Sequence, residues 1–136
     1  MKLCYIAGPY RAATESGVKE NIDAAWYMAS MVVKHAGKHG WFPVTPHLNS
    51  QFMGGLADDD YWIEGDLQIL KHCNAVLLLP NWDTSRGTLR EKEFAKARGI
   101  PIFLSYDHFH FSMIDSSNNR PNLGGDIMMP KDFEVI

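Results

Sequence analysis

The stretch LLLPNWDTSRGTLREKEFAKARGIPIF, residues 77–103, decides the fold. Its apolar start is typical of a buried strand that stops at Pro80, because proline has no amide hydrogen to give a sheet. A polar loop follows, then a charged helix pattern over about 88–98 that ends at Gly99, and then a second apolar run. A strand, a helix and another strand in this order predict parallel strands joined by a crossover helix.

The same alternation extends back to the start of the chain, where apolar residues between Val18 and Ala36 recur at helical spacing. We expect one α/β domain over residues 1–136: a doubly wound, Rossmann- or flavodoxin-like parallel sheet of four to five strands with helices on both faces. Predicted strands cover 3–7, 41–46, 75–79 and 100–104, and a short closing strand is predicted at 133–136. Predicted helices cover 18–36, 58–72 and 88–98. Ligands of such sheets bind beyond the carboxyl ends of the strands, at loops 8–16, 45–58, 80–88 and 105–116.

Composition excludes several functional classes. The formal charge of −3 and the absence of a basic run argue against a nucleic-acid polymer as partner. No apolar run approaches the roughly 18 residues of a membrane span. Cys4 and Cys73 have no metal-ligand spacing, so we expect two buried free thiols, and HFH at 108–110 lacks further ligands for a metal. The first ten residues do not resemble a signal peptide, so we expect a cytoplasmic protein.

Two carboxylates lie on helix stripes that should face the core. Glu91 precedes Phe94 and Ala95 by three and four residues, and Asp66 follows Ile63 by three residues and precedes Leu70 by four. A buried carboxylate is costly unless it is hydrogen-bonded or its pKa shifts. Two acids in one cleft suit cleavage of a glycosidic bond, in which one stabilises or attacks the sugar and the other handles the proton.

Each acid also has a simpler interpretation. TLRE at 88–91 fits a capping box, in which Thr88 caps the helix and Glu91 binds back to the Thr88 amide. Asp66 can equally be a partly exposed acid at a helix edge. The sequence leaves both alternatives open.

The loops after the strands carry the remaining candidates. In AGPYR, Gly8 permits a tight turn or a close backbone approach, and Arg11 either pairs with a phosphate or carboxylate or is simply solvated. In DTSRG, Ser85 and nearby amides either hold an anion or cap a helix.

Three further side chains have two interpretations each. His47 either lines a pocket or belongs to the polar surface, and Trp62 and Trp82 belong to the core or stack on a base. Neither a dinucleotide fingerprint nor a Walker loop is present in the sequence.

Three motifs in this order, YIAGPYR (5–11), GDLQILKHCNAVLLLP (65–80) and SRGTLRE (85–91), resemble the nucleoside 2-deoxyribosyltransferase family. The similarity spans about residues 3–104. It is closest to the small members of the family that act as deoxynucleoside 5′-monophosphate N-glycosidases.

The resemblance implies roles for individual residues. Glu91 is similar to the nucleophile of the family, and Tyr5 is similar to the tyrosine that positions this nucleophile. Asp66 is similar to the aspartate that the family has in a segment of the form D-L-x-x-[LI]. These three residues form the expected catalytic group. The expected substrate-binding residues are Gly8, Pro9, Tyr10, Arg11, His47, Ser85 and Gly87.

The resemblance also implies the partners. They are a small nucleoside or nucleotide and a second copy of the chain in a homo-oligomer, whose neighbour would complete the pocket through a segment like 111–118. Neither a metal nor an organic cofactor is expected.

Two departures from the family pattern bear on the substrate. Pro9 stands where monophosphate-cleaving relatives tend to have a hydroxyl residue, whereas Ser85 stands where transferases tend to have an acid. A serine adds no negative charge near a phosphate, which favours a nucleotide substrate. A non-catalytic nucleotide sensor and a purely structural domain are the alternative functions.

Overall fold

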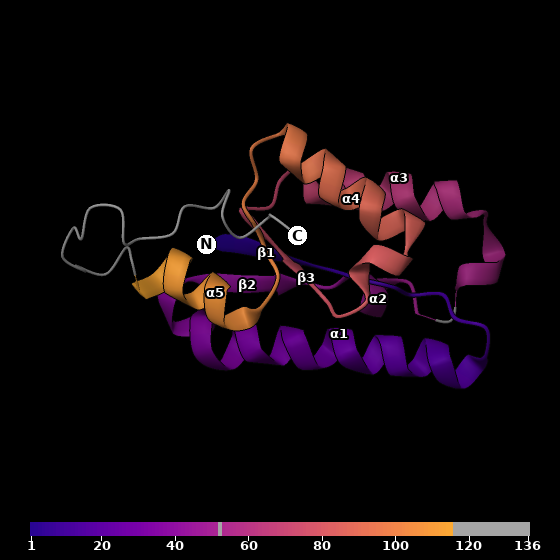
Figure 1. Cartoon of the computed structure of the whole chain (residues 1–136), viewed down its shortest axis with the longest axis horizontal. Coiled ribbons are helices and arrows are strands. Elements are labelled where there is room, and N and C mark those ends of the chain that lie inside the picture. Colours follow the sequence, from indigo (N-terminus) through magenta and orange to yellow (C-terminus); the bar gives the residue numbers. More distant parts are fainter. Residues whose placement is uncertain (52, 116–136) are drawn as a thin grey trace.

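A four-stranded parallel sheet lies at the centre of the chain, of which the computed structural model describes residues 1–51 and 53–115 (Figure 1). The strand order is β2-β1-β3-β4. The strands are β1 (Lys2–Ala7), β2 (Trp41–Val44), β3 (Ala75–Leu78) and β4 (Ile102–Phe103). The predicted doubly wound parallel sheet is therefore confirmed.

Helices cover both faces of this sheet because its strands are buried on both sides. Cys4 and Ile6 of β1 belong to the core beneath α1 (Glu15–Ala36) and α5 (Tyr106–His110). Tyr5 and Ala7 point to the opposite face, beneath α3 (Asp59–Leu70) and α4 (Arg86–Ala97), and Figure 1 shows the two helix layers on either side of the sheet. The short elements are η1 (Gly37–His39), α2 (Pro46–Asn49), η2 (Gly54–Leu56), η3 (Trp82–Thr84) and the π-helical turn η4 (Phe111–Asp115).

The crossover helices α1 and α3 both begin at side-chain caps. Asp58 accepts a hydrogen bond from the Tyr61 amide at 2.9 Å, so α3 begins within the acidic triplet as predicted. The first helix starts at Glu15 rather than Val18, because Thr14 Oγ1 accepts from the Gly17 amide at 3.1 Å. Gly99 follows α4 with φ of +72°, a conformation that glycine adopts without a steric cost.

The segment after β4 differs from the weakly patterned loop predicted there. It forms α5 and η4, whose Phe109 packs edge-on against Trp41 with ring centroids 4.9 Å apart. Loop 45–58 likewise contains α2 and η2, and β4 covers only two of the five predicted residues. The predicted strand at 133–136, and residues 116–118 of the predicted neighbour-completing segment, lie outside the described residues.

Cys4 and Cys73 are both buried free thiols, as predicted. They belong to the cores on opposite faces of the sheet. Within residues 1–51 and 53–115 the longest helices are too polar or too short to cross a bilayer.

Candidate active site

A pocket of about 270 Å³ opens at the carboxyl ends of β1 and β3. The chain leaves β1 toward β2 on one side and reaches β3 on the other, so these two strands flank the point where the winding of the sheet reverses. All of the predicted site residues except Tyr5 line this pocket, namely Gly8, Pro9, Tyr10, Arg11, His47, Asp66, Ser85, Gly87 and Glu91. The fold therefore gathers residues from two loops and from the helices α2, α3 and α4 around one cavity.

Glu91 points from α4 into this pocket and is only 8% exposed. The Tyr5 hydroxyl, which reaches it from β1, donates a hydrogen bond to Glu91 Oε2. The capping-box interpretation is wrong, because Ser85 is the N-cap of α4 and its Oγ accepts from the Thr88 amide at 3.2 Å. Glu91 is thus held by the Tyr5 side chain from β1 rather than by the backbone of its own helix.

Burial dominates the electrostatics of the two inward acids. It raises the pKa of Glu91 to about 8, an effect that the Tyr5 hydrogen bond opposes and the charge of Asp66 reinforces. Burial likewise raises the pKa of Asp66 to about 6. The pKa of Tyr5 lies well above its ordinary value because of burial and the nearby Glu91, so Tyr5 stays protonated and is the donor of the pair. Near pH 7 the two acids together hold about one proton.

The loop after β1 approaches the end of β3 closely. A Cβ atom on Gly8 would lie 2.5 Å from Leu79 Cβ, so only glycine fits this position. The Pro9 carbonyl accepts a hydrogen bond from His47 Nε2 at 2.9 Å, and Arg11 forms an ion pair with Asp59. Arg11 thus pairs with a carboxylate while its side chain stays 61% exposed, so both interpretations of Arg11 hold in part.

His47 lies in α2 and is 5% exposed, so its assignment to the polar surface is also wrong. Burial lowers the pKa of His47, while the carbonyls of Pro9 and Gly8 act in the opposite direction. Nδ1 of the ring is buried and makes no hydrogen bond of ordinary geometry. The Tyr10 ring lies beside it, with centroids 5.9 Å apart.

The loop after β3 turns sharply before α4. Asn81 adopts φ of +64°, which asparagine tolerates better than most residues, and its carbonyl accepts from Thr84 Oγ1 at 2.7 Å. Ser85 caps α4, as one of its two interpretations predicted, and it also lines the pocket, whereas its role in holding an anion stays a prediction. Gly87 follows it at the pocket wall, where a Cβ atom would make ordinary contact with Ile63 at 3.5 Å.

Sequence reasoning missed several residues of the pocket wall. Asp59, Arg86 and Thr88 line it. Of the two tryptophans that the sequence offered as candidates, Trp62 lines the pocket, whereas Trp82 packs against the core with its ring under the Lys92 amine. Trp62 Nε1 and Thr88 Oγ1 are buried without a hydrogen-bond partner. The acidic triplet and the helix stripe marked these positions, but the sequence does not show that their side chains converge.

Among residues 1–51 and 53–115 no three His, Cys, Asp or Glu side chains cluster in a way suited to a metal ion. Of the HFH motif, His110 accepts or donates a 2.9 Å hydrogen bond with the Tyr106 hydroxyl and lies 3.5 Å from Asp115.

Comparison with known families adds one finding. Residues 2–105 match the model of a family described as a domain of unknown function, DUF7768. The chain belongs to the DUF7768 family. The matched range contains all four strands and the whole pocket wall of this DUF7768 domain. No curated protein matches the chain. The family description carries no activity, so the resemblance to the nucleoside 2-deoxyribosyltransferases stays a prediction.

Proposed function

We propose that this protein cleaves the N-glycosidic bond of a small (deoxy)nucleoside or its 5′-monophosphate. The observation that carries the proposal is the environment of Glu91: a buried carboxyl group at a pocket wall, held by Tyr5 from another element, with Asp66 lining the same pocket. Carboxyl groups with raised pKa values in a shared cleft are the usual equipment of glycosidic bond cleavage. At about 270 Å³ the pocket lies just below the usual range of ligand sites, about 300 to 1,000 Å³.

Glu91 would act as the nucleophile. Its carboxylate attacks C1′ of the sugar, the bond from C1′ to the base nitrogen breaks, and a glycosyl-enzyme ester forms. The departing base takes the bonding electron pair together with a proton from Asp66. Because burial raises the pKa of Glu91 to about 8 and that of Asp66 to about 6, the reactive form is the minor form of the singly protonated pair, with the proton on Asp66 and the charge on Glu91. Tyr5 positions Glu91 and, by donating a hydrogen bond, favours its ionised form.

Water or a second base then resolves the ester. Attack by water releases the free sugar and regenerates Glu91, while attack by another base forms a new nucleoside. Asp66, ionised after the first step, accepts the proton of the attacking group. The proposal includes both outcomes, with hydrolysis slightly favoured, and needs neither a metal nor an organic cofactor.

The 5′ end of the substrate would lie near Arg11 and the start of α4. Arg11 supplies a positive charge, and the first amides of a twelve-residue helix point toward an anion placed there. Ser85 Oγ accepts from Thr88, which leaves its own hydrogen to donate to a phosphate oxygen. These groups favour a monophosphate over a neutral nucleoside.

One observation favours a binding-only role instead. A pKa of about 8 leaves most of Glu91 protonated at pH 7, and a neutral carboxyl group can donate a hydrogen bond to a ligand without reacting. A nucleotide or nucleotide-sugar sensor on the same fold is therefore the second candidate. It predicts nucleotide binding with no change in the nucleotide.

Product analysis separates these functions. The protein is incubated with each deoxynucleoside and each 5′-monophosphate, with and without a second free base, and the mixtures are chromatographed. Free base alone indicates hydrolysis, a swapped nucleoside indicates transfer, and unchanged substrate overturns the enzymatic proposal. Glu91→Gln should lose at least about 1,000-fold in kcat. The matched control is Glu93→Gln, which changes an exposed acid on the same helix and should keep full activity.

A further inference from the structure

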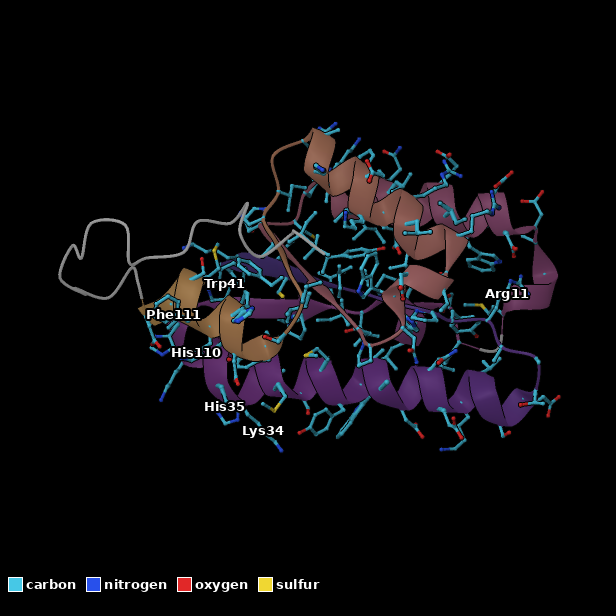
Figure 2. The ribbon with its side chains drawn as sticks, viewed as in Figure 1. Arg11, Lys34, His35, Trp41, His110 and Phe111 are labelled. Carbon is cyan, nitrogen blue, oxygen red and sulfur yellow. The ribbon has the colours of Figure 1, made fainter. Side chains whose placement is uncertain are left out.

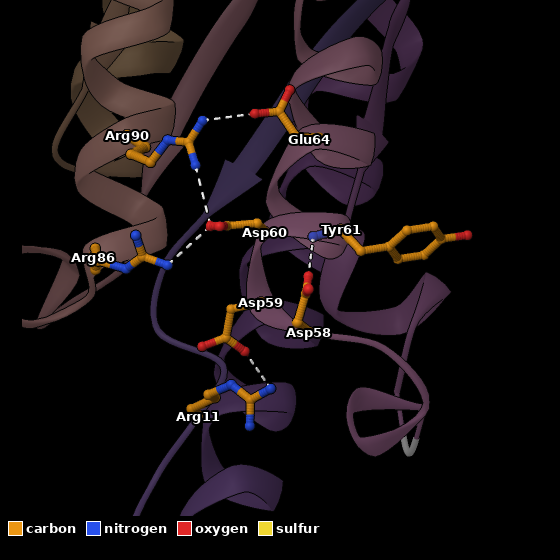
Figure 3. Close-up of polar contacts among 8 residues, drawn as sticks. All are labelled: Arg11, Asp58, Asp59, Asp60, Tyr61, Glu64, Arg86 and Arg90. Atoms are coloured by element: carbon orange, nitrogen blue, oxygen red, sulfur yellow. Dashed lines mark hydrogen bonds and ion pairs between the residues drawn. The ribbon is translucent and has the colours of Figure 1, made fainter.

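Arg11 lines the pocket as one half of an ion pair, because the carboxylate of Asp59 in α3 binds its guanidinium. The guanidinium comes from the loop after β1, and its partner Asp59 comes from the first turn of α3 (Figure 3). Both residues line the pocket. Their side chains are 61% and 49% exposed, so an incoming ligand can reach the pair.

The three consecutive acids at the start of α3 have different partners. Asp58 caps the helix through the Tyr61 amide, and Asp60 pairs with Arg86 at 3.2 Å and with Arg90 at 3.6 Å (Figure 3). Of these three acids, Asp59 is the one that lines the pocket. Of the triplet, it is therefore the acid whose charge a ligand in this pocket would meet.

The backbone of the loop after β1 has a separate anchor. Asn21 Nδ2, from α1, donates to the carbonyls of Tyr10 at 3.1 Å and Arg11 at 3.3 Å. The position of the Arg11 backbone consequently does not depend on Asp59. What Asp59 controls is the direction of the guanidinium and the net charge around it.

We propose that Asp59 is a specificity-determining counter-ion, which competes with the anionic group of a ligand for Arg11 and so reduces the preference of the pocket for a 5′-monophosphate over a neutral nucleoside. This inference rests on the proposed function. A phosphate must share Arg11 with Asp59 or displace it, and in both cases it meets a like charge at close range. A neutral nucleoside makes no such demand on Arg11.

Asp59→Asn removes the charge and keeps the size of the side chain. We expect this variant to bind 2-deoxyribose 5-phosphate about fivefold more tightly than the natural protein, while its affinity for 2-deoxyribose stays unchanged. Titration calorimetry measures both affinities without any turnover. The KM for the deoxynucleoside monophosphates should fall by the same factor, with the KM for the deoxynucleosides unchanged.

Glu64→Gln is the matched control. It removes one negative charge from the same helix, where Glu64 pairs with Arg90 at 2.8 Å and neither residue lines the pocket. If the control tightens phosphate binding as much as Asp59→Asn does, the effect is one of overall charge and the proposal is overturned. Weaker phosphate binding by Asp59→Asn also overturns it, because Asp59 would then position Arg11 for the phosphate rather than compete with it.

The remaining outcomes separate this inference from the proposed function. If the natural protein releases base from monophosphates but Asp59→Asn has unchanged affinities, the competition is absent and the proposed function stands. If the natural protein neither binds 2-deoxyribose 5-phosphate nor releases any base, the role of Asp59 and the proposed function fail together. Product analysis alone detects the missing release of base.

Discussion

The two ends of the molecule differ in how their buried groups are satisfied. Figure 2 shows Arg11, which lines the pocket, at one end, and Trp41, His110 and Phe111 at the other. The far end holds an aromatic cluster, defined by Trp41, Phe103, Tyr106 and Phe109, whose rings meet edge-on or tilted in the geometry that aromatic quadrupoles prefer. The cluster is apolar, and the one hydroxyl in it, on Tyr106, bonds to His110.

The pocket end has the opposite character. The described residues contain three buried side-chain polar atoms without a hydrogen bond of ordinary geometry, and all three belong to the pocket wall: His47 Nδ1, Trp62 Nε1 and Thr88 Oγ1. Each such atom costs about 1–3 kcal/mol. The raised pKa values of Glu91 and Asp66 add to that cost. One end of the fold thus stabilises the protein and the other end destabilises it, as sites selected for function commonly do.

The largest expected effect on stability comes from the aromatic cluster. Phe109 is fully buried between Trp41 and Phe103, so Phe109→Ala should lower the free energy of unfolding by about 4 kcal/mol through lost burial and a residual cavity. Urea unfolding followed by fluorescence measures the change. Activity per folded molecule should stay constant, because the cluster lies away from the pocket. A loss below about 1 kcal/mol would show that α5 does not depend on this contact.

This helix also marks a limit of sequence reasoning. The strands and the longer helices were predictable because their burial follows regular spacing along the chain, as with Ile22, Ala25, Ala29 and Val32 in α1. The five residues of α5 are too few to show a helical period. Their aromatic side chains form a helix because the core that they contact, at Trp41 and Phe103, comes from distant parts of the chain.

The candidate site was partly predictable for the same reason. The stripe on α4 places Glu91 inward, but a capping box and an inward carboxylate share that pattern. What distinguishes them is the Tyr5 hydroxyl, 86 positions away along the chain, together with the Ser85 cap. The pairing of Arg11 with Asp59 is equally non-local, so no local motif could have indicated it.

Neutralising Glu91 should raise the free energy of unfolding, the opposite of the loss expected for Phe109→Ala. Its pKa in the folded protein is about 8 against an ordinary value of 4.5, so its protonated form stabilises the fold below pH 4.5 and this contribution disappears as the pH rises through 8. Glu91→Gln mimics the protonated form and can still accept from Tyr5. We expect it to match the natural protein near pH 4.5 and to be more stable by about 3 kcal/mol at pH 7.

Thermal unfolding across this pH range measures the gain. Glu93→Gln, an exposed neighbour on the same helix, should show no such gain at any pH. A variant at position 91 that is less stable than the natural protein at pH 8 would mean that the carboxylate stabilises the fold, which would remove the contrast between the two ends.

The pH dependence of catalysis should report the same two acids. The reactive form needs one proton on the pair, so kcat/KM should follow a bell with limbs near pH 6 and pH 8, falling about tenfold per pH unit outside them. Below the lower limb no nucleophile is ionised, and above the upper limb no proton donor is left. Asp66→Asn should lose one of the two limbs. A flat profile between pH 5 and pH 9 would contradict control of the rate by these acids.

The smallest effect on activity is expected at Tyr5, and it tests the hydrogen bond between Tyr5 and Glu91 at the pocket end. Tyr5→Phe keeps the buried ring in the core between β1 and α4 but removes the donor to Glu91 Oε2. Since that hydrogen bond lowers the pKa of Glu91, its loss should raise the pKa further and reduce kcat/KM at pH 7 by about tenfold. The upper limb of the pH profile should move to higher pH, a change that a loss of packing alone does not produce. Tyr27→Phe, which removes an exposed hydroxyl from α1, is the control and should leave rate and profile unchanged. If Tyr5→Phe lowers the rate but leaves the pH profile unchanged, the hydroxyl orients Glu91 without changing its pKa. The buried carboxylate would then reduce the stability of the fold with no effect of Tyr5 on its ionisation.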